Sequence, residues 1–166
     1  MKRDFSSLSP QEALWVAVAI EDRNAEIYEN FAVMFRDYDP ETLAIFREMG
    51  AEERGHKTEL EARYRERYGP ETLALQPEDI QQPIEAPIIE HGELFIYEGL
   101  SMRGALEVGL RAEREARDFY RQLAARTGDE ALRALYRELA DTEDDHEIRA
   151  AARGYPATHR SSHHRT

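Results

Sequence analysis

The sequence predicts an all-α protein, a four-helix bundle of two antiparallel helix pairs joined by a long crossover. Two observations support this prediction. Four long segments carry apolar stripes, and in the first of them the apolar residues lie three, four and seven positions apart, which places them on one face of a helix. Between the second and third segments, residues 69–100 contain four prolines, which argue against a continuous helix there.

The first two helices are predicted to form one antiparallel pair. Ser9-Pro10 is typical of a helix start, because a capping residue precedes proline at the first helical position. This helix is expected to end near Asp39-Pro40, where the second begins, and the second to stop before Gly69-Pro70. Their apolar stripes consist of Leu14, Val18, Ala25, Tyr28, Ala32 and Phe35, and of Leu43, Phe46, Met49, Leu60 and Tyr64.

The last two helices are predicted to form the second pair. Ser101 is a good cap for the third helix, which is expected to end near Thr127-Gly128. Asp129 caps the fourth helix, which is expected to stop at Gly154-Tyr155-Pro156. Their stripes consist of Leu106, Leu110, Tyr120 and Leu123, and of Leu132, Leu135, Tyr136, Leu139 and Ala150.

The connection between the two pairs is long enough to return along the whole bundle. A helix of roughly 25 residues is about 37 Å long, and a partly extended linker of this length covers that distance. One long crossover between two helix pairs is the connectivity of ferritin-like bundles.

Composition narrows the possible classes of protein. At 166 residues the chain has the size of one domain, and we expect a bundle over residues 1–156 and a disordered polar tail over 157–166. The absence of cysteine excludes disulfides, cysteine-based zinc sites and rubredoxin-type iron centres. A net charge of −12 disfavours nucleic acid as a partner. The longest apolar run, Ala13–Ile20, is too short to span a bilayer, so we expect no membrane insertion and a cytoplasmic location.

Each predicted helix has polar residues in the middle of its apolar stripe. They are Glu21 in the first helix, Glu53 and His56 in the second, Glu113 in the third, and Glu143 and His146 in the fourth. Residues three apart share a helix face, so each Glu-x-x-His pair directs two side chains the same way. The two halves of the sequence repeat this pattern, with a tyrosine seven positions after the first glutamate of each half.

Four carboxylates that converge in one core need compensating positive charge, because each buried charge costs several kcal/mol. Two divalent ions balance four carboxylates, and one Glu from each of two helices plus Glu-x-x-His from the other two is a ligand set of di-metal bundles. The sequence therefore predicts a site for two metal ions. The alternative is that these residues are partly solvated or paired with Arg54, Arg114 or Arg117.

Other polar and aromatic residues have two interpretations each. Tyr28 and Tyr120 follow Glu21 and Glu113 by two helical turns, so either phenol could bind a ligand carboxylate or carry an oxidising equivalent; the alternative is a core aromatic. The histidines outside the predicted helices are expected to be solvated, although those of the tail could bind metal loosely. They are His91, His159, His163 and His164.

The sequence resembles the rubrerythrin/ferritin-like superfamily, and most of all the ferritin-like domain that some bacteria fuse to a membrane iron exporter. The resemblance covers about residues 5–153. The stretches that carry it are Ala19-Ile20-Glu21 through Tyr28-Glu29-Asn30-Phe31-Ala32, Glu52-Glu53-Arg54-Gly55-His56, Arg65-Glu66-Arg67-Tyr68-Gly69-Pro70, Glu113 through Phe119-Tyr120, and Glu143-Asp144-Asp145-His146.

The resemblance implies a site for two Fe ions, with Mn or a mixed Fe/Mn pair as alternatives, and with the six interrupting residues as ligands. It also implies that Glu53 and Glu143 bridge the ions and that Glu21 and Glu113 are terminal ligands. Two features depart from rubrerythrins. Leu110 stands where they carry an additional ligand glutamate, and the cysteines of their rubredoxin centre are missing. Peroxide reduction would therefore need an external electron donor.

Three functions are compatible with these residues. The leading hypothesis is a redox di-iron protein that reacts with O2 or peroxide, either as a ferroxidase or as a peroxidase. The second is a non-enzymatic module that binds, delivers or senses iron. The third is a helical interaction protein without a metal. A homodimer is also expected, formed through a two-helix face such as one with Trp15 or the crossover.

Overall fold

The computed structural model describes residues 2–37, 40–81 and 102–154, and it contains four long helices, which confirms the predicted all-α four-helix bundle. Their bounds are Pro10–Met34 for α1, Pro40–Tyr68 for α2, Met102–Arg126 for α3 and Glu130–Gly154 for α4. The largest deviation from the predicted bounds is the end of α1, which stops at Met34 and not near Asp39. No helix in the described part of the chain is long and apolar enough to cross a membrane.

The helix ends follow from local side-chain chemistry. At the start of α1, the Ser9 hydroxyl accepts a hydrogen bond from the Glu12 N–H at 3.2 Å, and the Glu12 carboxylate accepts one from the Ser9 N–H at 2.9 Å. Asp129 caps α4 by accepting from the Leu132 N–H at 2.9 Å. Gly69 follows α2 with a φ of 84°, the left-handed conformation that ends many helices.

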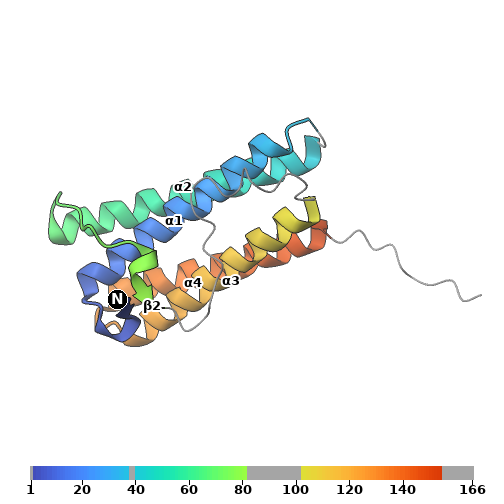
Figure 1. Ribbon diagram of the computed structural model, residues 1–166. Helices are drawn as coiled ribbons and strands as arrows, with labels where there is room; N and C mark the ends of the chain where they lie inside the picture. Colours follow the sequence, from blue (N-terminus) through green and yellow to red (C-terminus); the bar gives the residue numbers. More distant parts are fainter. Residues whose placement is uncertain (1, 38–39, 82–101, 155–166) are drawn as a thin grey trace, which may run out of the picture.

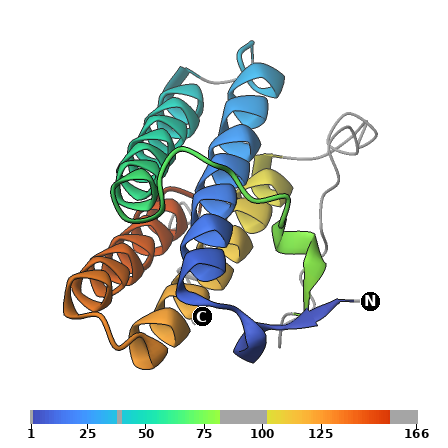
Figure 2. The ribbon, with the colours of Figure 1, turned by 90° about the vertical axis from the view of Figure 1, so that its left-hand side faces the viewer.

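The helices pack as two pairs, α1 beside α2 and α3 beside α4 (Figure 1). Helix α2 ends at one end of the bundle and α3 begins at the other, which is the arrangement of helix ends that a crossover topology requires. The chain after α2 crosses the N-terminal end of α1 (Figure 2).

Two short strands, which were not predicted, pair this crossing segment with residues near the N-terminus. Strand β1 (Arg3–Asp4) pairs in parallel with β2 (Ile80–Gln81), and Arg3 lies opposite Ile80. A 3-10 turn flanks each strand, η1 (Phe5–Ser7) after β1 and η2 (Pro77–Asp79) before β2. The predictions for Ser101, for His91 and for the tail with His159, His163 and His164 fall outside the described residues.

Two hydrophobic clusters fill the bundle. One lies around the first half of α1, the end of α2, the end of α3 and the start of α4, and includes Leu14, Leu60, Tyr120 and Leu139. The other lies around the second half of α1, the start of α2 and the start of α3, and includes Phe31, Phe46 and Ala105. The residues that interrupt the apolar stripes occupy the layer between these clusters, so the fold places them in the middle of the core.

Candidate metal centre

The six polar residues that interrupt the helix stripes meet at the centre of the bundle. Five of them are completely buried, namely Glu21, Glu53, Glu113, Glu143 and His146. The sixth, His56, has 17% of its side chain exposed. All four helices contribute to the cluster, so its geometry depends on how the two pairs dock. Each ligand-capable atom is held in place by the turn of helix from which its side chain extends.

The ligand-capable atoms of these residues form two overlapping groups. One consists of Glu21, Glu53, His56 and Glu143, and the other of Glu53, Glu113, Glu143 and His146. Within each group, the selected oxygen and nitrogen atoms all lie within 4.8 Å of one another. Glu53 and Glu143 belong to both groups, whereas the other four residues belong to one. We call the first group the His56 half-site and the second the His146 half-site.

Both imidazoles direct Nδ1 toward the carboxylates. The His56 Nδ1 lies 3.2 Å from a Glu21 oxygen, 3.7 Å from Glu53 and 3.8 Å from Glu143. The corresponding distances from the His146 Nδ1 are 3.1 Å to Glu53, 3.2 Å to Glu113 and 3.7 Å to Glu143. The two rings lie nearly parallel, with their centroids 5.9 Å apart. Each half-site therefore has one nitrogen and three carboxylate donors.

Burial and mutual contact shift the pKa values of these groups strongly. Burial raises the pKa of Glu21 to about 8, and it raises the pKa of Glu143 well above the usual range. Burial would also raise the pKa of Glu53, but contacts with both imidazoles outweigh it and lower that pKa to about 2. Burial would lower the pKa of His56, yet contacts with Glu21 and Glu53 raise it to about 10. These shifts indicate that the buried carboxylates need positive charge beside them, which either bound protons or metal cations can supply.

The shared carboxylates show which kind of cation fits. Among the described residues, neither oxygen of Glu53 and neither oxygen of Glu143 has a hydrogen-bond partner, although all four are buried. Buried carboxylate oxygens are costly unless hydrogen bonds or cations compensate them. Carboxylate oxygens combined with imidazole nitrogens suit divalent iron or manganese. The donor set therefore fits two divalent ions, whose four positive charges balance four carboxylates.

The two tyrosines bind carboxylates of the opposite helix pair. The Tyr28 hydroxyl of α1 donates a hydrogen bond to Glu113 of α3, and the Tyr120 hydroxyl of α3 donates one to Glu21 of α1. Burial raises the pKa of both phenols well above the usual value. Each ring lies in the core and each hydroxyl contacts a carboxylate that the sequence predicts as a ligand, whereas a role of the phenols in a reaction stays a prediction. The partner, however, is not the glutamate of the same helix.

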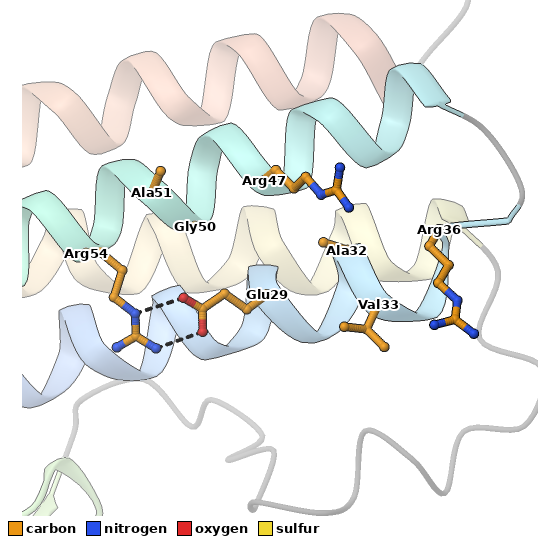
Figure 3. Close-up of a pocket in the computed structure, with 8 residues that line it drawn as sticks. All are labelled: Glu29, Ala32, Val33, Arg36, Arg47, Gly50, Ala51 and Arg54. Carbon is orange, nitrogen blue, oxygen red and sulfur yellow. Dashed lines mark hydrogen bonds and ion pairs between the residues drawn. The ribbon is translucent and has the colours of Figure 1, made fainter.

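Two of the three arginines named in the alternative hypothesis, Arg54 and Arg117, pair with carboxylates outside the cluster. Arg54 lines a surface pocket between α1 and α2, where its guanidinium donates hydrogen bonds of 2.8 and 2.7 Å to Glu29 (Figure 3). It also pairs with Asp22. Arg117 donates to Asp144 at 3.1 Å. These two arginines therefore balance surface charge and do not neutralise the buried glutamates.

Two residues near the cluster, Glu52 and Gly109, were not identified from the sequence as parts of it, and a third, Asn24, could from its spacing face either the site or the surface. A carboxylate oxygen of Glu52 contacts Nε2 of His146. Gly109 leaves room for the Tyr28 ring, because a Cβ at this position would lie 3.0 Å from a ring carbon and 3.1 Å from the hydroxyl. Asn24 is 4% exposed and lies one turn after Glu21. No spacing rule distinguishes Glu52 or Gly109 from the many other glutamates and glycines of the chain.

Comparisons with known proteins agree with this architecture. A hypothetical protein from Pyrococcus furiosus superposes with a TM-score of 0.68 at 21% sequence identity, over 90% of this chain and 90% of the other. An uncharacterised conserved protein from Magnetospirillum magnetotacticum superposes with a TM-score of 0.69 at 21% identity, over 93% of this chain and 100% of the other. At this identity the similarity shows a shared fold.

Among curated proteins, no match to this chain was found. The model of the rubrerythrin family, by contrast, matches residues 12–153, which include all four helices almost completely and all six residues of the cluster. The chain therefore belongs to the rubrerythrin family.

Proposed function

We propose that this chain is a di-iron carboxylate protein whose buried cluster holds two Fe ions that react with O2 or peroxide. The observation that carries the proposal is the pair of overlapping half-sites, which share Glu53 and Glu143. Glu53 and Glu143, which belong to both half-sites, would contribute to holding both ions. Glu21 with His56, and Glu113 with His146, complete one ligand set each. Two Mn ions or a mixed pair would suit the same donors.

The residues around the cluster prepare it for metal. The hydrophobic clusters on both sides exclude water, which strengthens the attraction between the carboxylates and a cation. Tyr28 and Tyr120 each occupy one oxygen of a terminal carboxylate and so fix its orientation. When bound, two Fe(II) ions supply electrons to O2 or peroxide. Because the chain has no cysteine with which to hold a rubredoxin centre, repeated peroxide reduction requires an external electron donor.

The experiment starts from protein purified without chelator. Elemental analysis gives the metal content, and an anaerobic Fe(II) titration gives the stoichiometry. A pulse of O2 or peroxide then tests the reaction, followed by near-ultraviolet absorption and by consumption of the oxidant. We expect two Fe per chain and rapid oxidation of both. Binding of only one loosely held ion, without a change in melting temperature, would contradict the proposal.

The same experiment separates oxidation from iron delivery. A module that hands iron to a partner is the second candidate, and the partly exposed His56 favours it because this residue offers a side of the cluster nearer to solvent. Tight binding of two Fe(II) with slow oxidation, and transfer of iron to an added chelator, would identify a delivery or sensing module. Rapid consumption of oxidant would identify a ferroxidase or peroxidase.

A further inference from the structure

The two half-sites differ in what lies behind their imidazoles. The His146 ring is completely buried, and its Nε2, on the side away from the cluster, contacts a carboxylate oxygen of Glu52. The two atoms lie within ion-pair distance, and Nε2 has no hydrogen-bond partner among the described residues. Glu52 has 33% of its side chain exposed and directly precedes the shared ligand Glu53.

The corresponding position in the second helix pair has no carboxylate. The residue that directly precedes Glu143 is Thr142, whose hydroxyl donates a hydrogen bond of 3.0 Å to the carbonyl oxygen of Glu138 in its own helix. Within the described part of the chain, the ion pairs of His56 all involve Nδ1. Among the described residues, carboxylates therefore contact the His56 ring at Nδ1 alone, and the His56 side chain is 17% exposed.

A carboxylate behind a ligating imidazole has a defined physical effect. It accepts the proton on the outer nitrogen, which fixes the tautomer that leaves the inner nitrogen free to bind metal. It also fixes the ring orientation and increases the basicity of the ligand. Loss of such a partner typically weakens metal binding by roughly tenfold to a hundredfold. Among the described residues, only the His146 half-site has a carboxylate placed behind its imidazole.

We infer that Glu52 is a positioning residue for His146, and that it makes the two half-sites unequal. The His146 half-site binds its ion first and holds it more tightly, and the His56 half-site binds the second, more exchangeable ion. This inference rests on the proposed function, because it requires that both half-sites bind metal. It adds an order of loading and identifies the ion that a partner or chelator removes first.

The test is a calorimetric titration of the metal-free chain with Co(II) under anaerobic conditions, in parallel with the visible absorption of bound Co(II). We expect two resolved binding steps. Glu52→Ala should weaken the tight step by roughly ten- to a hundredfold and leave the weak step nearly unchanged. Glu52→Gln should have a smaller effect, because its amide oxygen still accepts the imidazole proton. Thermal melting of the metal-free variants monitors folding.

Three further variants assign the steps. Glu66→Gln removes the same charge from an exposed position of α2 and should change neither step. His146→Ala should abolish the tight step, and His56→Ala should abolish the weak one. Two equal steps in the native chain, or a tight step that Glu52→Ala leaves intact, would overturn this inference but not the di-metal site. A native chain that binds no Co(II) and no Fe(II) would overturn both.

Discussion

The two helix pairs of this protein supply the same side chains from corresponding positions but surround them differently. The pair α1 and α2 contributes Glu21, Tyr28, Glu53 and His56, and the pair α3 and α4 contributes Glu113, Tyr120, Glu143 and His146. The residues that surround these side chains differ between the two pairs. Glu52 corresponds to Thr142, Asn24 to Ala116, and Gly109 to Ala17. The groups that contact the proposed ions are thus repeated, whereas the residues that position those groups are not.

This difference shows which part of the structure the proposed chemistry constrains. Two equal cations need two equivalent sets of donors, so the repeat is kept where charge must be balanced. The packing around the donors and the contacts that orient each imidazole do not have to be the same in both halves, and these are the properties in which the halves differ. The predictions below test first the shared features and then the differences.

Removal of a shared carboxylate should have the largest effect. Glu53 belongs to both half-sites, so Glu53→Ala should abolish binding of both ions. Glu21 belongs only to the His56 half-site, and Glu21→Ala should leave one ion bound. Elemental analysis after equilibrium dialysis against Fe(II) measures the difference, with Glu66→Ala as the surface control. Equal losses in the two ligand variants would contradict the assignment of Glu53 as shared.

The metal-free protein should lose stability as the pH rises. The pKa of Glu21 is about 4.5 in the unfolded chain and about 8 in the folded protein. The pKa of His56 is about 6.5 in the unfolded chain and about 10 in the folded protein. Between these values the folded state binds more protons than the unfolded state, so the free energy of unfolding falls with increasing pH. The contribution of His56 to the free energy of unfolding is fully present below pH 6.5 and is lost as the pH rises through about 10.

Bound metal should reverse this trend, because metal replaces those protons and binds more tightly as the pH rises. Thermal unfolding at both ends of the pH window, with and without Mn(II), checks the prediction. The difference in melting temperature between loaded and metal-free protein should widen toward alkaline pH. A metal-free protein whose stability is independent of pH across this window would show that the buried carboxyl and imidazole groups are not coupled as described.

The two tyrosines should be equivalent. Tyr28→Phe and Tyr120→Phe each remove the hydrogen bond to one terminal carboxylate, and each should cost about 1–3 kcal/mol of stability. Urea denaturation of the metal-free variants measures both. The double variant should lose close to the sum, since the hydroxyls bind different carboxylates. If only one substitution destabilises the protein, the reciprocal pairing between the helix pairs is wrong for the other.

Substitution of Gly109 should show the smallest difference in stability between the two helix pairs. In Gly109→Ala the added Cβ crowds the Tyr28 ring, a cost of about 1–3 kcal/mol that the higher helix propensity of alanine, about 1 kcal/mol, offsets in part. Denaturation should therefore show a small net loss. The loss should shrink in the Tyr28→Phe background and persist in the Tyr120→Phe background. Equal losses in the two backgrounds would mean that Gly109 does not make room for the Tyr28 hydroxyl.

The sequence predicted the four helices and the core-facing positions of the six polar residues, because both follow from periodicity along single helices. That the six residues meet was predicted from the ligand pattern of di-metal bundles. Glu53 and His56 share a face whatever the helix packs against. The contact of Tyr28 with Glu113 could not be predicted this way. Tyr28 lies on the same face as Glu21, but which glutamate its hydroxyl reaches depends on how α1 and α3 are offset, and that offset is a property of the assembled bundle.

The other surprises have the same origin. Glu52 contacts His146 of a helix that lies far away in the sequence, so no local pattern distinguishes it from the exposed glutamates of α2. The pairing of β1 with β2 joins residues near the N-terminus to residues after α2, and two-residue strands leave no periodicity to detect. Such contacts depend on tertiary packing and not on the propensities of the segments.

The most direct test of the central claim is a crystal structure of the iron-loaded chain with anomalous scattering measured at the iron edge. We expect two peaks between the four helices, about 3.5–4 Å apart as in other two-metal sites. One peak should lie next to Nδ1 of His56 and the other next to Nδ1 of His146, with Glu53 and Glu143 between them. A single peak, or iron bound only at surface carboxylates, would contradict a di-iron centre in this protein.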